Sequence, residues 1–188
     1  MSSRLFLEKI ASEALLRESA TAEDVAFVEQ FGSEKRRCEV LAWRAIVRRE
    51  LGQSVEISHD ENGAPQVDSP HTYISIAHSR EMVAVAISDA PCAVDIEDCN
   101  RDFRRVASKY LSSTEHTLAE QYNLFAEMWS AKEALYKFHR RGGVNYVSDV
   151  AILAYDALSH SFIASICGGE RVTVAMQKEA NHIIALIG

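Results

Sequence analysis

The order in which hydrophobic patterns change along the chain most constrains its fold. A helical pattern in residues 11–51 gives way, after a polar and turn-rich stretch, to runs in which side chains alternate with a period of two. Helical patterns return in 102–110 and 114–140, and strand-like runs follow at 146–154, 161–167, 171–177 and 182–187. Helices followed by strands, twice over, predict an α+β chain, with two similar halves that meet near residue 100.

Strand signals are clearest in the middle of the chain. Residues 73–77 and 82–87 are separated by a short turn, and 93–97 follow a turn that contains Pro91. We expect these three runs to form an antiparallel meander. Residues 4–10 also read as a strand, and 54–58 could form another.

Two capping signals divide the first helical region. Thr21 followed by Asp24 is typical of a helix start, and Gly32-Ser33 before Glu34 indicates a break and a second start. Residues 11–51 are therefore expected to hold at least two helices.

Composition excludes several classes of protein. The 188 residues are 47% hydrophobic and 25% charged, which is typical of globular proteins rather than disordered ones. A net charge of −7 argues against bulk binding of nucleic acid. Apolar runs stay short of the roughly 20 residues of a membrane helix, and the N-terminus is too charged for a secretory signal. The four cysteines form no C-x-x-C pair, so we expect a reducing, cytoplasmic location.

Asp95 and Glu97 lie two residues apart in an otherwise apolar strand. Side chains alternate across a strand, so both carboxylates point to one face. Burying two like charges is costly unless a cation lies between them, and Mg²⁺ prefers such oxygen ligands. On spacing alone, the acidic solvent face of an edge strand is the more common explanation.

The helix expected near 122–139 carries a second candidate pair. Its apolar seam consists of Leu124, Met128, Ala131, Leu135 and Phe138. Glu133 and Lys137 lie roughly opposite this seam and would ordinarily form a surface ion pair. Trp129 and Tyr136 share the side of Glu133, however, so this side is expected to be covered as well. A covered Glu–Lys pair is a candidate site.

Basic residues gather in 34–49. Helical spacing puts Arg37, Arg44 and Arg48 on one face, with Lys35 and Arg36 near the helix start. A phosphate would be held well there, although a solvated basic face is the simpler interpretation. His78 and Ser79, directly after a strand, could contact a phosphate or merely form a turn. Together, acidic metal ligands, basic residues and a Glu–Lys pair favour metal-assisted attack on a phosphoester or pyrophosphate.

Three motifs carry a resemblance to a known family. They are I-A-H-S (76–79), A-V-D-I-E (93–97) and W-S-A-K-E-A-L-Y-K (129–137). In this order and spacing they resemble the 4′-phosphopantetheinyl transferases of the surfactin-synthetase-activating type. The resemblance covers roughly residues 33–140. It departs from the family pattern at Ala77, usually serine, and at Ala64, usually lysine.

The resemblance implies an activity and roles for residues. The family transfers phosphopantetheine from coenzyme A to a serine of an acyl or peptidyl carrier protein, as in fatty-acid biosynthesis, and releases adenosine 3′,5′-bisphosphate. By resemblance, this chain would be a holo-[acyl-carrier-protein] synthase. Asp95, Glu97 and Glu133 correspond to Mg²⁺ ligands, Glu133 also to the proton acceptor, and Lys137 to the lysine at the leaving phosphate. The expected nucleotide-binding residues are Lys35, Arg36, Arg37, Arg44, His78 and Ser79.

The resemblance also implies the architecture. It predicts the family's pseudo-dimeric fold of two α/β-sandwich-like lobes, in which antiparallel sheets pack against helices. Residues 1–100 would form a nucleotide-binding lobe with the first metal ligands, and 101–188 a lobe with the catalytic helix and carrier docking. We expect a monomer that binds neither nucleic acid nor membrane. Two alternatives stay open: a relative that binds coenzyme A or a carrier without turnover, and a metal-dependent nucleotide pyrophosphatase.

Overall fold

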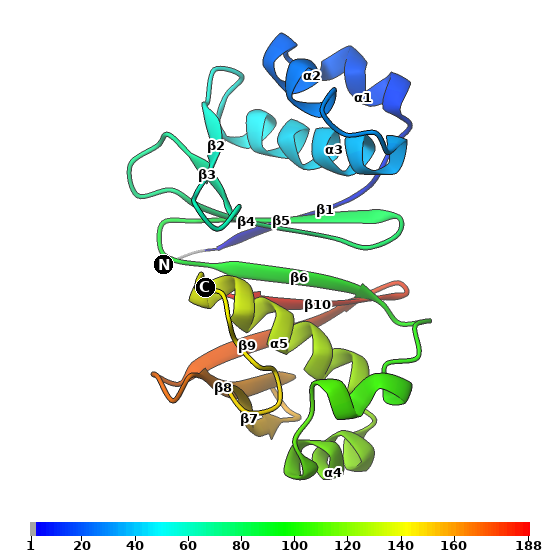
Figure 1. Ribbon diagram of the computed structural model, residues 1–188, viewed down its shortest axis with the longest axis vertical. Helices are drawn as coiled ribbons and strands as arrows, with labels where there is room; N and C mark the ends of the chain where they lie inside the picture. The colour runs from blue at the N-terminus through cyan, green and yellow to red at the C-terminus, as the bar shows by residue number, and fades with distance from the viewer. Residues whose placement is uncertain (1–2) are drawn as a thin grey trace.

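The computed structural model describes residues 3–188, and its first half is a three-stranded sheet covered by helices (Figure 1). The antiparallel strand order is β1-β5-β4, with β1 at Arg4–Lys9, β4 at Tyr73–His78 and β5 at Met82–Ser88. The helices are α1 (Glu13–Ser19), α2 (Ala22–Val28) and α3 (Glu34–Leu51). A small hairpin of β2 (Ile57–His59) and β3 (Pro65–Val67) follows α3, and the sequence patterns had indicated only the first of its strands.

The second half is a five-stranded antiparallel sheet packed against one long helix. Its strand order is β6-β10-β9-β8-β7. The strands are β6 (Ala93–Asp98), β7 (Val150–Asp156), β8 (Ser161–Ile166), β9 (Val172–Glu179) and β10 (His182–Ile187). The helices are a 3₁₀ helix at Arg104–Lys109, α4 (Ser113–Tyr122) and α5 (Phe125–His139). None of the helices in residues 3–188 is long and apolar enough to span a membrane.

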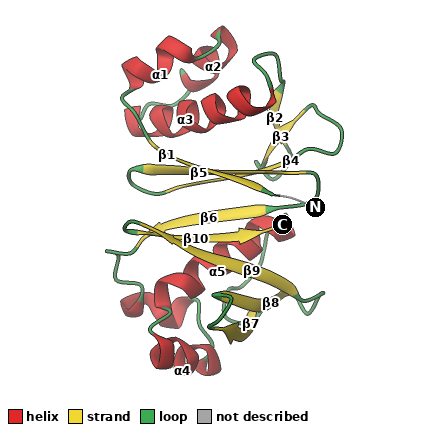
Figure 2. Ribbon diagram, turned by 180° about the vertical axis from the view of Figure 1, so that it is seen from behind, coloured by secondary structure: helices red, strands yellow, loops and turns green. Residues whose placement is uncertain are grey.

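The two sheets lie back to back in the middle of the molecule, with α3 outside one and α5 outside the other (Figures 1 and 2). Small and β-branched side chains meet between the sheets, among them Ala84, Ala86, Val94 and Ile184. The α+β architecture with two lobes of antiparallel sheet and packed helices is therefore confirmed. Short side chains at this interface allow the sheets, and so the elements that carry the candidate site, to approach closely.

The expected meander of three strands is wrong. β4 and β5 pair as a hairpin, but β6 pairs along its whole length with β10, from Ala93 opposite Ile187 to Asp98 opposite His182. β6 is joined to β4 through the side chain of Ser75, which accepts a hydrogen bond from the amide of Val94 at 3.0 Å. The five-stranded sheet of the second half thus includes β6, which lies within the first hundred residues. The lobe boundary near residue 100 stays a prediction.

The long helical pattern of residues 114–140 is two helices rather than one. Asn123 has a left-handed backbone with φ of 54°, which asparagine tolerates, and ends α4. α5 then begins at Phe125, and its expected apolar seam is confirmed: Met128, Ala131 and Leu135 are fully buried. Burial of the seam against β6–β10 fixes which side chains of α5 face β6.

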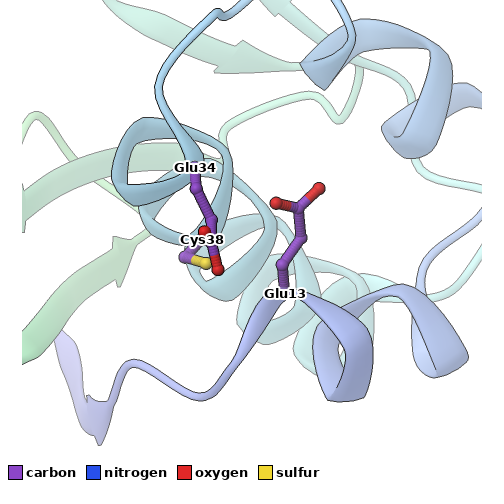
Figure 3. A group of neighbouring side chains, drawn as sticks. All are labelled: Glu13, Glu34 and Cys38. Atoms are coloured by element: carbon purple, nitrogen blue, oxygen red, sulfur yellow. The ribbon is translucent and has the colours of Figure 1, made fainter.

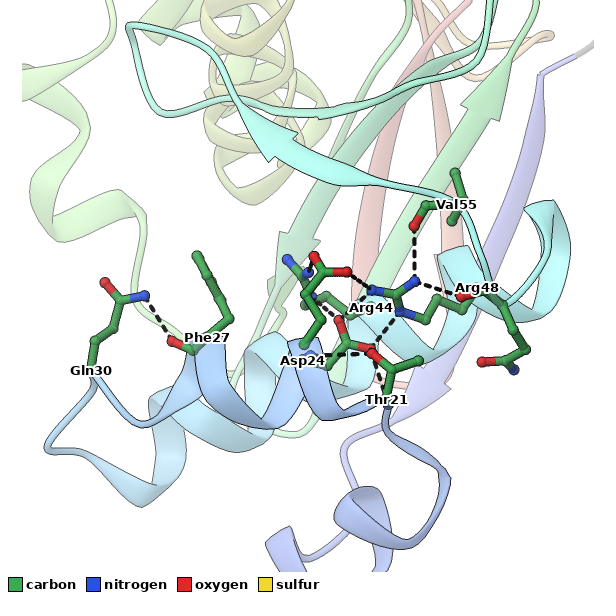
Figure 4. Close-up of polar contacts among 9 residues, drawn as sticks. Thr21, Asp24, Phe27, Gln30, Arg44, Arg48 and Val55 are labelled. Atoms are coloured by element: carbon green, nitrogen blue, oxygen red, sulfur yellow. Dashed lines mark hydrogen bonds and ion pairs between the residues drawn. The ribbon is translucent and has the colours of Figure 1, made fainter.

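A buried ion-pair network joins α2 to α3 (Figure 4). Thr21 and Asp24 form the expected capping box, and Ser33 caps α3 as expected. Asp24 also accepts hydrogen bonds from Arg44 and Arg48, and all three side chains are at most 3% exposed. Burial alone would raise the pKa of Asp24, but the bonds from Arg48 and Arg44 hold that pKa at about 2.

We expect the Asp24 network to be lost in acid. Because the pKa of Asp24 lies below its ordinary unfolded value near 4, the network contributes roughly 2 kcal/mol above pH 4, and this contribution disappears as pH falls toward 2. Urea unfolding of the protein and of Asp24→Asn between pH 7 and pH 3 measures it. The free-energy difference between the two should shrink as pH falls. A constant difference would show that Asp24 does not titrate with folding.

Candidate functional site

Two carboxylates on β6 face α5. Alternation along the strand sends Val94 and Ile96 into the layer between the sheets, whereas Asp95 and Glu97 point to the opposite face. Their partners in register on β10 are Ala185 and Ile183, which belong to the core beneath α5. The predicted common face of the two carboxylates is therefore the one that α5 covers.

Side chains of α5 hold both carboxylates. Asp95 is 6% exposed and accepts hydrogen bonds from the Ser130 hydroxyl at 2.9 Å and from Lys137 Nζ at 2.8 Å. Lys137 also donates to the carbonyl oxygen of Val94 at 3.0 Å. Glu97 accepts a hydrogen bond from Trp129 Nε1 at 2.6 Å. Three residues of one helical motif thus contact the two carboxylates of one strand motif.

Glu133 is the third acid of this cluster. It lies half-buried on α5, near the charges of Asp95 and Lys137. Burial raises the pKa of Glu133, and the Asp95 carboxylate raises it further. Burial raises the pKa of Glu97 as well, again with a contribution from Asp95. Burial and the nearby Asp95 charge therefore make the ionised forms of Glu97 and Glu133 less stable, and a bound cation would stabilise these forms.

The donor set of Asp95, Glu97 and Glu133 suits a hard divalent cation, because all the ligands are carboxylate oxygens. Their oxygens are not gathered into one compact group, however. Within residues 3–188, Glu13, Glu34 and Cys38 are the one such trio of ligands whose atoms all lie within 4.8 Å of one another. The reason is local: Asp95 is drawn to Lys137 and Ser130, and Glu97 to Trp129 and Arg101.

The compact trio near α1 is already neutralised without a metal (Figure 3). Both oxygens of Glu13 accept hydrogen bonds from Arg37, and Arg17 binds the same carboxylate. These arginine bonds hold the pKa of Glu13 at about 2. Burial raises the pKa of the Cys38 thiol, which keeps it protonated and a poor ligand. The trio is therefore part of the ion pairing between α1 and α3.

A cavity of about 360 Å³ lies beside the acidic cluster. Lys137 belongs to both, because it lines the cavity while its Nζ contacts Asp95. The first half of the chain contributes residues from α3, the turn at 60–65 and β4, and the second half contributes α5 and residues 140–142. None of the lining residues in the described chain is an aspartate or glutamate, whereas several are cationic. The cavity is therefore suited to an anionic ligand.

Two of the predicted phosphate-binding residues line this cavity together. Arg36 projects from the first turn of α3 and His78 from the end of β4, and Arg36 NH1 lies 3.0 Å from His78 Nε2. Burial lowers the pKa of His78, although Glu39 lies 3.4 Å from its Nδ1. A neutral His78 can accept the hydrogen bond from Arg36 at Nε2.

The other predicted phosphate-binding residues are not brought to the cavity. Arg44 is buried against Asp24, and Arg37 is bound to Glu13 and to the carbonyl oxygen of Phe31. Lys35 faces a separate surface hollow between α3 and the β4–β5 turn. The Ser79 hydroxyl accepts a hydrogen bond from the amide of Met82 within that turn. The basic run of 34–49 is thus mostly structural.

Sequence reasoning missed the role of Lys132, which is buried in the same helical motif. Its Nζ donates to Glu115 at 2.9 Å and to the carbonyl oxygens of Tyr146 and Val150 at 2.8 and 2.6 Å. Glu115 also accepts from the amide of Ile152 at 2.7 Å. Lys132 therefore joins α5, α4 and the segment before β7. A lysine on the apolar side of α5, between Met128 and Leu135, was the available signal.

Comparison with known proteins places this chain in a family. The family model of the 4′-phosphopantetheinyl transferase superfamily matches residues 91–186, and the chain belongs to this superfamily. The match begins just before β6 and includes α5, so it contains the whole acidic cluster.

A curated relative is similar over part of this region. The 4′-phosphopantetheinyl transferase psf-1 of Bacillus pumilus is 31% identical over 88 residues, which are 43% of this chain and 38% of that protein. The alignment thus spans well under half of the relative. It supports the resemblance to the surfactin-activating type.

Proposed function

We propose that this protein transfers 4′-phosphopantetheine from coenzyme A to a serine hydroxyl of an acyl or peptidyl carrier protein. One observation carries the proposal: Asp95 and Glu97 on β6 meet Glu133 and Lys137 on α5 at the edge of a cationic cavity between the two halves. The cavity can take the nucleotide phosphates of coenzyme A, and the acidic cluster then faces its pyrophosphate.

Asp95, Glu97 and Glu133 would hold Mg²⁺ in this proposal. When bound, the ion supplies charge neutralisation of the pyrophosphate and aligns the phosphorus for attack. Glu133 takes the proton of the carrier serine as the serine oxygen forms its bond to phosphorus. The bond from that phosphorus to the bridging oxygen breaks, and adenosine 3′,5′-bisphosphate leaves. Lys137, fixed by Asp95, meets the negative charge that develops on the leaving oxygen.

The assay that tests the proposal follows release of adenosine 3′,5′-bisphosphate by chromatography, with and without an apo carrier protein. We expect release only when the carrier is present. Release without the carrier would instead support a nucleotide pyrophosphatase. Binding of coenzyme A with no release under either condition would support a relative that binds without turnover.

We expect Lys137→Ala to lower kcat by roughly a hundredfold while the KM for coenzyme A changes little. The reason is that a fixed cation at the leaving oxygen acts mainly in the transition state. Steady-state kinetics with varied coenzyme A measures both constants. Arg171→Ala, which removes an exposed charge just before β9, is the control. A rise confined to KM would show that Lys137 only binds the substrate.

A further inference from the structure

The two carboxylates of β6 are held in the same manner. In each of them, one oxygen accepts a hydrogen bond from a neutral donor of α5, and the other oxygen contacts a cation. The neutral donors are Ser130 for Asp95 and Trp129 for Glu97. The cations are Lys137 for Asp95 and Arg101 for Glu97. Two side chains thus supply part of the positive charge that a metal ion would supply when bound.

The two cations differ in how firmly they are placed. Lys137 donates both to Asp95 and to the carbonyl oxygen of Val94, and its side chain is 28% exposed. The side chain of Arg101 is 58% exposed, and its one ion pair is the contact with Glu97. Ion pairs this exposed are weak, because water screens the charges and a long side chain loses freedom in forming them. Arg101 is therefore the cation of the cluster that leaves more easily.

Arg101 has other favourable surroundings close to Glu97. Its guanidinium group lies 4.9 Å from the centre of the Phe103 ring, a contact that does not depend on Glu97. The surface hollow that Arg101 lines is also lined by Asp102 and Glu127. A guanidinium group that leaves Glu97 therefore stays beside an aromatic ring and in acidic surroundings.

Glu97 is held in place without Arg101. Trp129 Nε1 donates to Glu97 Oε1 at 2.6 Å, and the backbone of Glu97 pairs with Ile183 of β10. Within residues 3–188, the Oε2 atom has Arg101 as its one hydrogen-bond partner. Departure of Arg101 therefore frees a carboxylate oxygen that is suited to a hard divalent cation. A guanidinium group and a divalent cation at the same oxygen repel each other, so only one of them occupies it.

We propose that Arg101 is a resident counter-cation of Glu97 that a divalent metal ion must displace, so that Arg101 sets the metal affinity of the acidic cluster. The inference rests on the proposed function, because it concerns the ion of that mechanism. Without metal, Arg101 limits the repulsion between Glu97 and the neighbouring acids Asp95 and Glu133. Because the ion pair is exposed and weak, its displacement lowers metal affinity by a factor of a few rather than by orders of magnitude.

Titration of the full chain with Mn²⁺ tests the inference, with coenzyme A bound and no carrier protein present. Mn²⁺ shares the preference of Mg²⁺ for oxygen ligands, and electron paramagnetic resonance measures the free ion. In Arg101→Gln the Kd for Mn²⁺ should fall about fivefold, because a neutral side chain does not compete. Arg101→Lys, which keeps the charge, should stay within about twofold of the unaltered protein.

The matched control is Arg104→Gln. Arg104 is 61% exposed and pairs with Glu120, outside the acidic cluster. Its replacement removes the same charge from the same surface and should change the Kd for Mn²⁺ by less than about twofold. An equal fall in both glutamine variants would overturn the inference, since it would show only a general effect of charge. An unchanged or higher Kd in Arg101→Gln would overturn it too.

A second measurement follows the displacement itself. In nitrogen-15 NMR spectra of the protein with coenzyme A bound, the Nε–H signal of Arg101 should shift as Mg²⁺ is added, whereas that of Arg104 stays in place. An Arg101 signal that does not move at saturating Mg²⁺ would overturn the inference and leave the proposed function intact. Failure of the unaltered protein to bind Mn²⁺ would instead contradict the metal site of the proposed function, and this inference with it.

Discussion

Replacing Asp95 by asparagine is expected to lower the rate of phosphopantetheine transfer by about a thousandfold or more. Asparagine keeps the size of the side chain and an oxygen that can accept from Ser130, but it removes the negative charge beside Lys137. In the proposed mechanism, loss of this metal ligand would leave the pyrophosphate charge uncompensated during attack. Rates of carrier modification at saturating coenzyme A and Mg²⁺ measure the effect.

The matched control for this change is Asp98→Asn on the same strand. Asp98 lies at the end of β6, and among the described residues its side chain bonds only to Asn100, outside the acidic cluster. It should keep near-full activity. Circular dichroism should show that Asp95→Asn remains folded. Full activity of Asp95→Asn would remove Asp95 from the metal site.

Replacing Lys132 by methionine is expected to destabilise the protein by about 3–5 kcal/mol. The ammonium group is fully buried and serves Glu115 and two backbone carbonyl groups at once. Without it, a buried carboxylate loses its counter-charge and the carbonyl oxygens of Tyr146 and Val150 lose a donor. Urea unfolding followed by tryptophan fluorescence measures the loss.

A second substitution separates charge from packing at this position. The double variant Lys132→Met/Glu115→Gln should recover part of the lost stability, because it removes the unpaired buried charge. The exposed Lys109→Met should change stability by less than about 0.5 kcal/mol. A loss below about 1 kcal/mol for Lys132→Met would contradict a structural role for this lysine.

Local patterns predicted most elements but not their pairing. The capping signals at Thr21 and Ser33 and the seam of α5 depend on neighbours within a few residues, so the sequence reveals them. The partner of β6 could not be read in the same way. Its register is set by β10, some 90 residues later, and the alternation of Ala93–Asp98 is equally compatible with pairing to β5.

In the candidate site, too, the sequence predicts local features but not contacts between distant segments. The common face of Asp95 and Glu97 follows from the strand period, which is local. Their contact with α5 is a tertiary contact, and at the level of sequence only the family resemblance implied it. The basic run in residues 34–49 led to a wrong prediction of phosphate binding by Arg37 and Arg44, because an arginine on a helix pairs with any acidic side chain that tertiary packing places beside it. Asp24 and Glu13 reach Arg44 and Arg37 only through tertiary packing. Arg140 and Arg141 lie in a loop without periodicity, and only the folded chain shows them beside the cavity.

The most direct test is mass spectrometry of an intact apo carrier protein after incubation with this protein, coenzyme A and Mg²⁺. We expect the carrier to gain the mass of one phosphopantetheine group. The gain should disappear when EDTA removes the metal and when Glu133 is replaced by glutamine. A carrier of unchanged mass, across acyl and peptidyl carriers and with coenzyme A bound to the protein, would contradict the account.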